Sequence, residues 1–281
     1  MSRYLVKHKT GFRYSEPVVA SYNEVRMLPV RDNSQVVFSS QLEINPKPAS
    51  HEYSDYFGTR VVMFEILEEH TELEIVSTNL VELRPVPQAD RSLGWAQLAE
   101  AIERSLELKD AATQGTRTQI PADLTKAAKR LAQAAASPVE AATAICRFIY
   151  SSMKYQFGVT GVQSNASEAW QKKIGVCQDF THLAIGALRS VGIPARYVSG
   201  YLHPQVEPRI GQPVEGESHA WVEWYAGEWI PNDPTNNLEF PDRHIVVARG
   251  RDYDDVPPLR GVYAGGANSE LFVKVEITRE A

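Results

Sequence analysis

The sequence predicts an α+β protein in which an all-β N-terminal region precedes a region of helices and antiparallel strands. Residues 3–84 alternate between apolar and polar side chains, with Pro, Gly and Asn between the alternating runs. Helical patterns begin only near residue 95, and alternating runs return after residue 195. The 281 residues, 43% of them hydrophobic, suffice for two cores. We therefore expect a β-rich domain at 1–87, with the fold of a sandwich, and a catalytic domain at 88–281.

Individual elements follow from these patterns. In the first domain, strands are predicted at 4–9, 36–44, 60–67 and 72–77. Pro85 and Pro87 then predict a stiff linker. In the second domain, helices are predicted at 95–109, 122–135 and 138–153, and strands at 195–202, 219–225, 229–233, 243–248 and 270–279.

Cys177 is the most informative residue, because it opens another predicted helix. Apolar residues recur at helical spacing after it, and Gly175 allows a tight entry. The partial positive charge at a helix N-terminus favours a thiolate. A lone cysteine is nevertheless more often a small buried hydrophobe, so its role depends on what lies downstream.

A predicted β-hairpin at 217–236 supplies the other polar residues. If 225–227 form its loop, Trp224 opposes Glu228 and His219 opposes Asp233. Directly opposed residues have Cβ atoms about 4.5 to 5.5 Å apart, so the carboxylate could hold the imidazole. A slip of one residue would separate them onto opposite faces. Cys177 as nucleophile, His219 as base and Asp233 as the group that orients His219 form a complete catalytic set.

The chain resembles the transglutaminase-like superfamily of papain-related thiol enzymes. The motifs that carry the resemblance lie at 175–180, 192–201, 218–223 and 233–236, within a match over about residues 140 to 250. The first ninety or so residues also resemble the β-rich N-terminal region of bacterial members. The resemblance implies a papain-like core, in which a Cys-bearing helix packs on an antiparallel sheet, and a triad of Cys177, His219 and Asp233.

The activity implied is thiol-dependent acyl transfer on an amide or peptide bond through a thioester. Water as acceptor would make the protein a cysteine protease or amidase, and an amine would make it a transglutaminase; the sequence favours neither. The Cys177 N–H is the first candidate donor to an oxyanion. Tyr155, Gln163 and Trp170 are candidates for the second donor, although packing explains each equally well.

Other functions are less well supported. A metal site of Cys177, His182 and His219 is disfavoured, because five residues along a helix turn His182 well away from Cys177. A redox thiol lacks a Cys-x-x-Cys partner, and Cys146 lies in an apolar helical stretch. We therefore expect no metal and no cofactor. A non-catalytic binding or assembly module that retains the triad stays as the alternative.

Composition and the N-terminal sequence bear on partners and location. The net charge of −6 argues against nucleic acid, and no run of about 18 apolar residues or apolar leader occurs. We expect a cytoplasmic protein that acts on a protein or peptide substrate and binds no membrane. The oligomeric state cannot be predicted from these observations.

Overall fold

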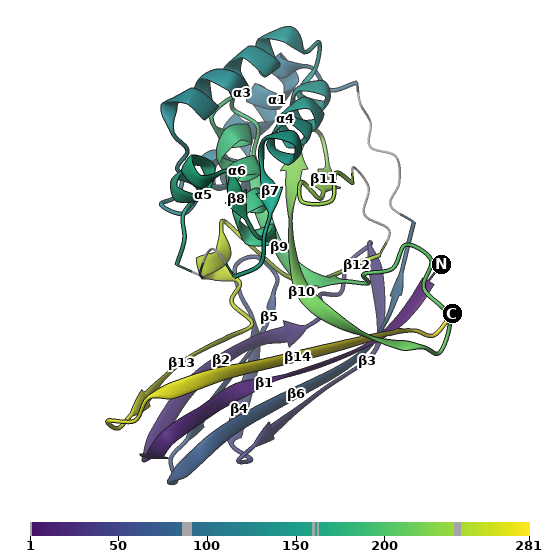
Figure 1. Ribbon diagram of the computed structural model, residues 1–281. Helices are drawn as coiled ribbons and strands as arrows, with labels where there is room; N and C mark the ends of the chain where they lie inside the picture. Colours follow the sequence, from purple (N-terminus) through teal and green to yellow (C-terminus); the bar gives the residue numbers. More distant parts are fainter. Residues whose placement is uncertain (1, 86–91, 159–160, 162, 239–242) are drawn as a thin grey trace.

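The computed structural model describes residues 2–85, 92–158, 161, 163–238 and 243–281. Figure 1 shows a helical part above a long twisted pair of sheets, with strand β10 (Pro213–Tyr225) running from one to the other. The predicted linker lies mostly outside the described residues, since they stop at 85.

The N-terminal region is a sandwich of two antiparallel sheets, as the alternating pattern predicts. One sheet contains β1 (Ser2–Val18), β6 (His70–Leu83) and β3 (Gln35–Asn45), and the other contains β2 (Ala20–Leu28), β5 (Arg60–Ile66) and β4 (Ala49–Ser54). Their facing sides bury an apolar core that includes Val18, Met27, Phe64, Leu73 and Ile75. The sequence patterns did not reveal β2 and β4.

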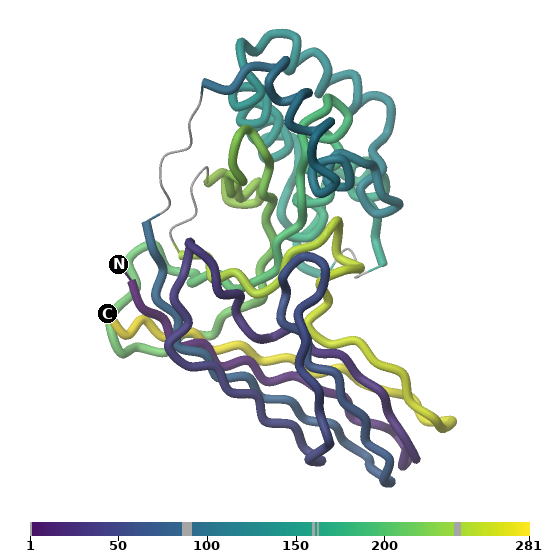
Figure 2. The backbone as a smooth tube through the Cα atoms, turned by 180° about the vertical axis from the view of Figure 1, so that it is seen from behind, coloured from purple at the N-terminus to yellow at the C-terminus, as the bar shows by residue number. Residues whose placement is uncertain are grey.

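The last two strands of the chain return to this sandwich. β13 (Leu259–Ala264) pairs with β2, and β14 (Ser269–Arg279) pairs with β1. Figure 2 shows the two termini side by side, where the Arg3 amide donates to the Ala281 carbonyl at 3.0 Å. Strands from both sides of residue 87 therefore share the same sheets.

The sandwich and the catalytic part also share one sheet. β10 pairs with β14 at Pro213 to Gly216 and with β9 (Ala195–Leu202) at Glu217 to Trp224. The strand order is β12-β9-β10-β14-β1-β6-β3, where β12 is His244–Gly250, and β11 (Trp229–Asn232) pairs with β10. β10 begins six residues before its predicted start because those residues join it to β14.

Among the described residues, the helices of the catalytic part are α1 (Trp95–Arg104), α2 (Leu106–Ala112), α3 (Ala122–Ala134), α4 (Pro138–Ser152), α5 (Ala166–Lys172) and α6 (Cys177–Arg189). The single helix predicted at 95–109 is two helices, because Ser105 is extended and its hydroxyl caps α2 at the Leu108 amide. At the start of α4, Ser137 is the N-cap and Pro138 occupies the first turn, an arrangement that sequence rules favour.

Helix α6 lies at the centre of the catalytic part. Every residue from Gln178 to Arg189 is buried. Its apolar side chains pack against residues of β9 and β10 and against α4, in a core that includes Ile145, Ala184, Leu188, Tyr197 and Val222. In the described part of the chain, no helix is long and apolar enough to cross a membrane.

Candidate active site

Cys177 is the first residue of α6, and the preceding turn is tightly constrained. Short strands β7 (Lys154–Tyr155) and β8 (Ile174–Gly175) pair in parallel just before it. The Val176 amide donates to Asp179 Oδ2 at 2.8 Å, which fixes the first turn of the helix. A Cβ atom on Gly175 would lie 2.7 Å from the Asp179 Cβ. Glycine is therefore required for this close entry to the helix.

His219 and Asp233 are in contact, although the predicted register is wrong. Tyr225 pairs with Trp229 and Val222 with Asn232, so the loop is Ala226 to Glu228. The observed pairing differs by two residues from the predicted one. A shift of two keeps each side chain on its face, and diagonal neighbours remain within reach of long side chains. The His219 Nε2 atom accordingly lies 2.7 Å from Asp233 Oδ2.

Asp233 is fully buried, and its carboxylate accepts five hydrogen bonds from described residues. Oδ1 accepts from the amides of Thr235 and Asn236 at 2.9 and 3.2 Å. Oδ2 accepts from His219 Nε2 at 2.7 Å, from Asn236 Nδ2 at 2.8 Å and from His244 Nε2 at 2.9 Å. Burial alone would raise the pKa of Asp233, but the hydrogen bonds from His219 and His244 and the charge of His219 hold it well below its usual range. The carboxylate is thus ionised and fixed.

The His219 ring is positioned between Asp233 and Cys177. An ionised carboxylate only accepts, so Nε2 carries a proton and Nδ1 is the nitrogen left to hydrogen-bond Cys177. Burial lowers the pKa of His219, but hydrogen bonds with Asp233 and Cys177 outweigh it and raise the pKa to about 10. An imidazolium beside the thiol is therefore favoured at neutral pH.

Trp221 and His244 complete the surroundings of His219. Trp221, 1% exposed, stacks on His219 with ring centroids 6.2 Å apart and meets His244 edge-on at 5.0 Å. Trp221 therefore forms one wall of the site, next to His219 and His244. Sequence reasoning missed His244: it predicted a strand there but carried no signal for which strand lies beside Asp233.

The three candidates for a second oxyanion donor are now distinguishable. Trp170 Nε1 donates to Asp123 at 2.8 Å, and Gln163 Oε1 accepts from Arg117 at 2.8 Å. Tyr155 pairs with Gly175, two residues before Cys177, and is 46% exposed. Burial and the charges of Cys177 and Glu217 raise the pKa of Tyr155. Of the three, Tyr155 is therefore the one close to the thiol.

His182 and Cys146 lie apart from this arrangement. His182 is 0% exposed, and its Nε2 accepts the backbone N–H of Tyr253 at 3.2 Å. Cys146 is a buried cysteine in α4 and forms no disulfide bond.

One group of side chains in the described residues is dense enough to be considered for a metal ion: His219, Asp233 and His244, whose ligand atoms lie within 4.8 Å of one another. The two imidazole N–H groups and the Asn236 amide already satisfy Asp233 Oδ2. Hydrogen bonding therefore accounts for the group.

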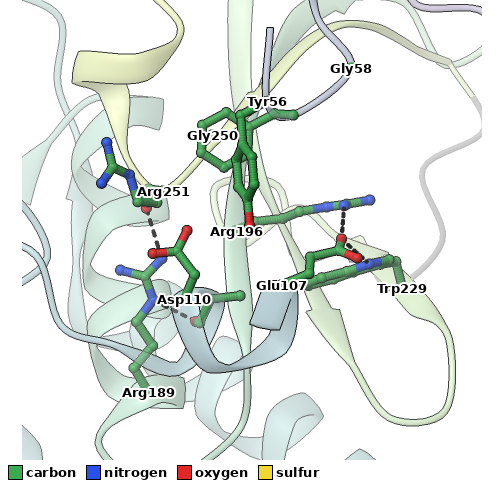
Figure 3. Close-up of a pocket in the computed structure, with 11 residues that line it drawn as sticks. Tyr56, Gly58, Glu107, Asp110, Arg189, Arg196, Trp229, Gly250 and Arg251 are labelled. Atoms are coloured by element: carbon green, nitrogen blue, oxygen red, sulfur yellow. Dashed lines mark hydrogen bonds and ion pairs between the residues drawn. The ribbon is translucent and has the colours of Figure 1, made fainter. Parts of the chain in front are cut away.

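A cavity of about 340 Å³ opens at the opposite end of α6, where Arg189 is the last residue (Figure 3). Its cationic side chains have partners within the protein. Arg196 stacks on Trp229 at 3.9 Å and bonds Glu107 and Glu223, and Arg189 donates to the carbonyls of Ala111, Ala195 and Arg251. The thirteen residues of α6 span about 20 Å, so this cavity is separate from Cys177.

Comparisons with known proteins place the chain in a family. Residues 125–234 match the model of the transglutaminase-like superfamily, and residues 4–82 match that of the bacterial transglutaminase-like N-terminal region. An uncharacterised protein of Mycobacterium leprae is 41% identical over 284 residues, covering 100% of both chains. A protein-glutamine gamma-glutamyltransferase of Pseudomonas aeruginosa is 30% identical over 123 residues, which cover 41% of this chain and 18% of that protein.

A solved structure has the same fold. The crystal structure of a protein from Cytophaga hutchinsonii, provisionally described as a cysteine protease, superposes with a TM-score of 0.77 at 24% identity. The superposition covers 100% of this chain and 91% of that one. On its sequence matches and its fold, this chain belongs to the transglutaminase-like superfamily.

Proposed function

We propose that this protein catalyses thiol-dependent acyl transfer on an amide or peptide bond, with Cys177 as nucleophile, His219 as acid and base, and Asp233 as the group that orients His219. The observation that carries the proposal is the buried His219–Asp233 hydrogen bond of 2.7 Å, which leaves Nδ1 of His219 for the Cys177 thiol. Nucleophile, base and orienting group come from α6, β10 and the turn after β11.

In the proposed steps, His219 first gives a proton to the leaving amine and later takes one from the acceptor. The Cys177 thiolate attacks the carbonyl carbon, the carbon–nitrogen bond breaks, and the Nδ1 proton of His219 passes to the leaving amine. A thioester on Cys177 remains. Water or a second amine then gives a proton to Nδ1 and attacks the thioester, which releases the Cys177 thiolate beside a protonated His219.

Two donors are proposed for the negative oxygen formed in each attack. The Cys177 amide lies in the first turn of α6, where backbone N–H groups have no partner within the helix. The Tyr155 hydroxyl is the second, because β7 and β8 hold this residue next to the approach to Cys177. Tyr155→Phe should therefore lower turnover more than it lowers alkylation of the thiol, since alkylation forms no oxyanion.

The substrate class proposed is a protein or peptide amide. The relationship to a protein-glutamine gamma-glutamyltransferase makes a glutamine side chain the first amide to try. Hydrolysis and transfer to an amine differ only in the acceptor, so both products should be sought in one experiment.

The test uses glutamine-containing peptides with and without a fluorescent primary amine. Release of ammonia alone indicates hydrolysis, and incorporation of the amine indicates transamidation. Cys177→Ala should abolish both, whereas Cys146→Ala, which removes the other cysteine of the chain, should abolish neither. If Cys177→Ala retained the activity, thiol acyl transfer would be excluded. If neither glutamine peptides nor a set of general peptide substrates reacted, the result would favour the alternative of a non-catalytic binding module.

A further inference from the structure

Two histidines donate to one oxygen of Asp233, and the triad uses only one of them. His244, the first residue of β12, is 5% exposed, and its Nε2 lies 2.9 Å from Asp233 Oδ2. The His219 and His244 rings are 5.5 Å apart. Oδ2 of Asp233 therefore accepts from the imidazole of the proposed triad and from a second, buried imidazole.

The hydrogen bonding determines the protonation state of His244. Because the Asp233 carboxylate only accepts, Nε2 of His244 carries a proton. Its Nδ1 is buried and has no hydrogen-bond partner among the described residues, so a second proton there would be unsatisfied. Burial lowers the pKa of His244, more than the Asp233 contact raises it, and the charges of His219 and Arg243 lower it further. His244 is thus a neutral donor.

A neutral donor whose Nε2 proton is bonded to Asp233 and whose Nδ1 is buried cannot exchange protons with a substrate at Cys177. We propose that His244 is a positioning residue, which holds Oδ2 of Asp233 in the orientation that fixes the His219 ring for Cys177. This inference rests on the proposed function. Without His244, Oδ2 would keep only Asn236 and His219 as donors, and both come from the hairpin and the turn that must be held in place.

β12 is a suitable anchor because both of its edges are hydrogen-bonded. One edge pairs with β9. On the other, the Val246 amide donates to Gln35 Oε1 at 2.9 Å, and the Val246 carbonyl accepts from Gln35 Nε2 at 2.8 Å and from the Val30 amide at 3.2 Å. Gln35 is 2% exposed and belongs to β3 of the sandwich. The N-terminal region therefore supports His244 through Val246, two residues away.

The experiment measures alkylation of Cys177 by iodoacetamide at about pH 6, where a free thiol is almost entirely protonated. Four proteins are compared: the native chain, His219→Ala, His244→Leu and His244→Gln. Glutamine keeps an N–H donor near the Nε2 position, and leucine removes it. We expect His244→Leu to react about tenfold more slowly, and His244→Gln to stay within about threefold of the native rate.

A second measurement separates positioning from simple stabilisation. The titration of His219, followed by NMR of 15N-labelled histidine, should move to lower pH in His244→Leu, since a carboxylate that can turn away holds the imidazolium less well. His244→Gln should move it less. If the leucine variant does not fold, His244→Asn replaces it, because that shorter amide cannot reach Oδ2.

The outcomes distinguish this inference from the proposed function. If His244→Leu lowers the thermal unfolding temperature but leaves both the alkylation rate and the His219 titration unchanged, His244 is only structural and the inference is overturned. If His219→Ala reacts as fast as the native protein, the proposed function itself fails. Slow reaction in both His219→Ala and His244→Leu, with recovery in His244→Gln, supports both.

Discussion

The His219 Nε2 atom lies 2.7 Å from Oδ2 of Asp233, although the hairpin pairs Val222 with Asn232 and so does not set these two residues directly opposite each other. The two side chains lie on the same face of the sheet as diagonal neighbours and are long enough to meet. Of the other four hydrogen bonds that described residues donate to the Asp233 carboxylate, three come from its own turn, at Thr235 and Asn236. The orientation of His219 therefore depends on the turn after β11 as much as on the strands.

Asp233→Asn should strongly lower the rate of amide turnover at Cys177. An amide can present a donor to His219 Nε2, which would favour the wrong tautomer, and it brings no charge to stabilise the imidazolium. We expect the rate of amide turnover to fall by about 10² to 10⁴-fold. The measurement is kcat/KM on an active peptide substrate. Asp254→Asn, a change at an exposed carboxylate, is the control and should leave the rate nearly unchanged.

Turnover should decline at high pH. The pKa of His219 is raised to about 10, so the imidazolium that protonates the leaving amine is present below that pH and lost above it. Alkylation needs no proton donor and should not fall over the same range. A pH profile of kcat/KM beside one of alkylation checks this, and a decline of turnover near the ordinary histidine value of about 6.5 would contradict it.

Gly175→Ala should disturb the start of α6. The added Cβ would meet Asp179 at 2.7 Å, so the bond from the Val176 amide to Asp179 Oδ2 would be displaced. We expect slower alkylation of Cys177, measured by mass spectrometry in the folded protein. Gly161→Ala is the matched control, because nothing lies within 4 Å of a Cβ atom there. Equal rates in the two variants would show that the tight entry is unimportant.

Acid should destabilise the fold through two buried histidines. Burial lowers the pKa of His8 to about 4 and that of His182 to about 3, from the ordinary 6.5. Between those values the unfolded chain binds more protons than the folded one, so the free energy of unfolding decreases as the pH falls below 6.5. Each group contributes up to about 1.4 kcal/mol per pH unit over its own range.

Urea unfolding at several pH values measures this effect. His182→Gln should make the free energy of unfolding less dependent on pH between about 6.5 and 4. His51→Gln, the same substitution at an exposed position, is the matched control. An unchanged slope in His182→Gln would show that His182 is protonated in the folded protein.

Glu223→Gln should cost more stability than Glu107→Gln, although both carboxylates pair with Arg196. Glu223 is 5% exposed and also binds Arg249, so its loss leaves two guanidinium groups poorly compensated. We expect a loss of about 3 kcal/mol for Glu223→Gln and below about 1 kcal/mol for the more exposed Glu107. Urea unfolding of both variants checks the difference, and equal losses would contradict it.

Local sequence patterns were sufficient for much of this architecture. The strand at Ala195–Leu202 and the start of α6 at Cys177 follow from apolar periodicity and from Gly175. The proximity of His219 and Asp233 could also be predicted, because two strands joined by a short turn are neighbours in a sheet. Their exact register could not be predicted, since a loop of three residues at 225–227 and one at 226–228 fit the same turn signal.

The pairing of strands that are far apart in the chain could not be predicted from the sequence. Nothing local indicates that β14 lies between β1 and β10, or that His244 reaches Asp233, because such contacts depend on the order of strands in the sheet. β2 was missed because its burial alternates irregularly and its last residues are buried on both faces. The catalytic roles, the cytoplasmic location and the domain boundary at residue 87 stay predictions.

The most direct test of the account is the rate at which iodoacetamide alkylates Cys177 across the pH range, in the native protein and in His219→Ala, with buried Cys146 as an internal reference. The account predicts rapid reaction of native Cys177 at about pH 6, well below the range in which a free thiol ionises, and loss of that reactivity in His219→Ala. If native Cys177 reacts only after unfolding, or equally fast in both proteins, His219 does not activate it and the proposed acyl transfer is contradicted.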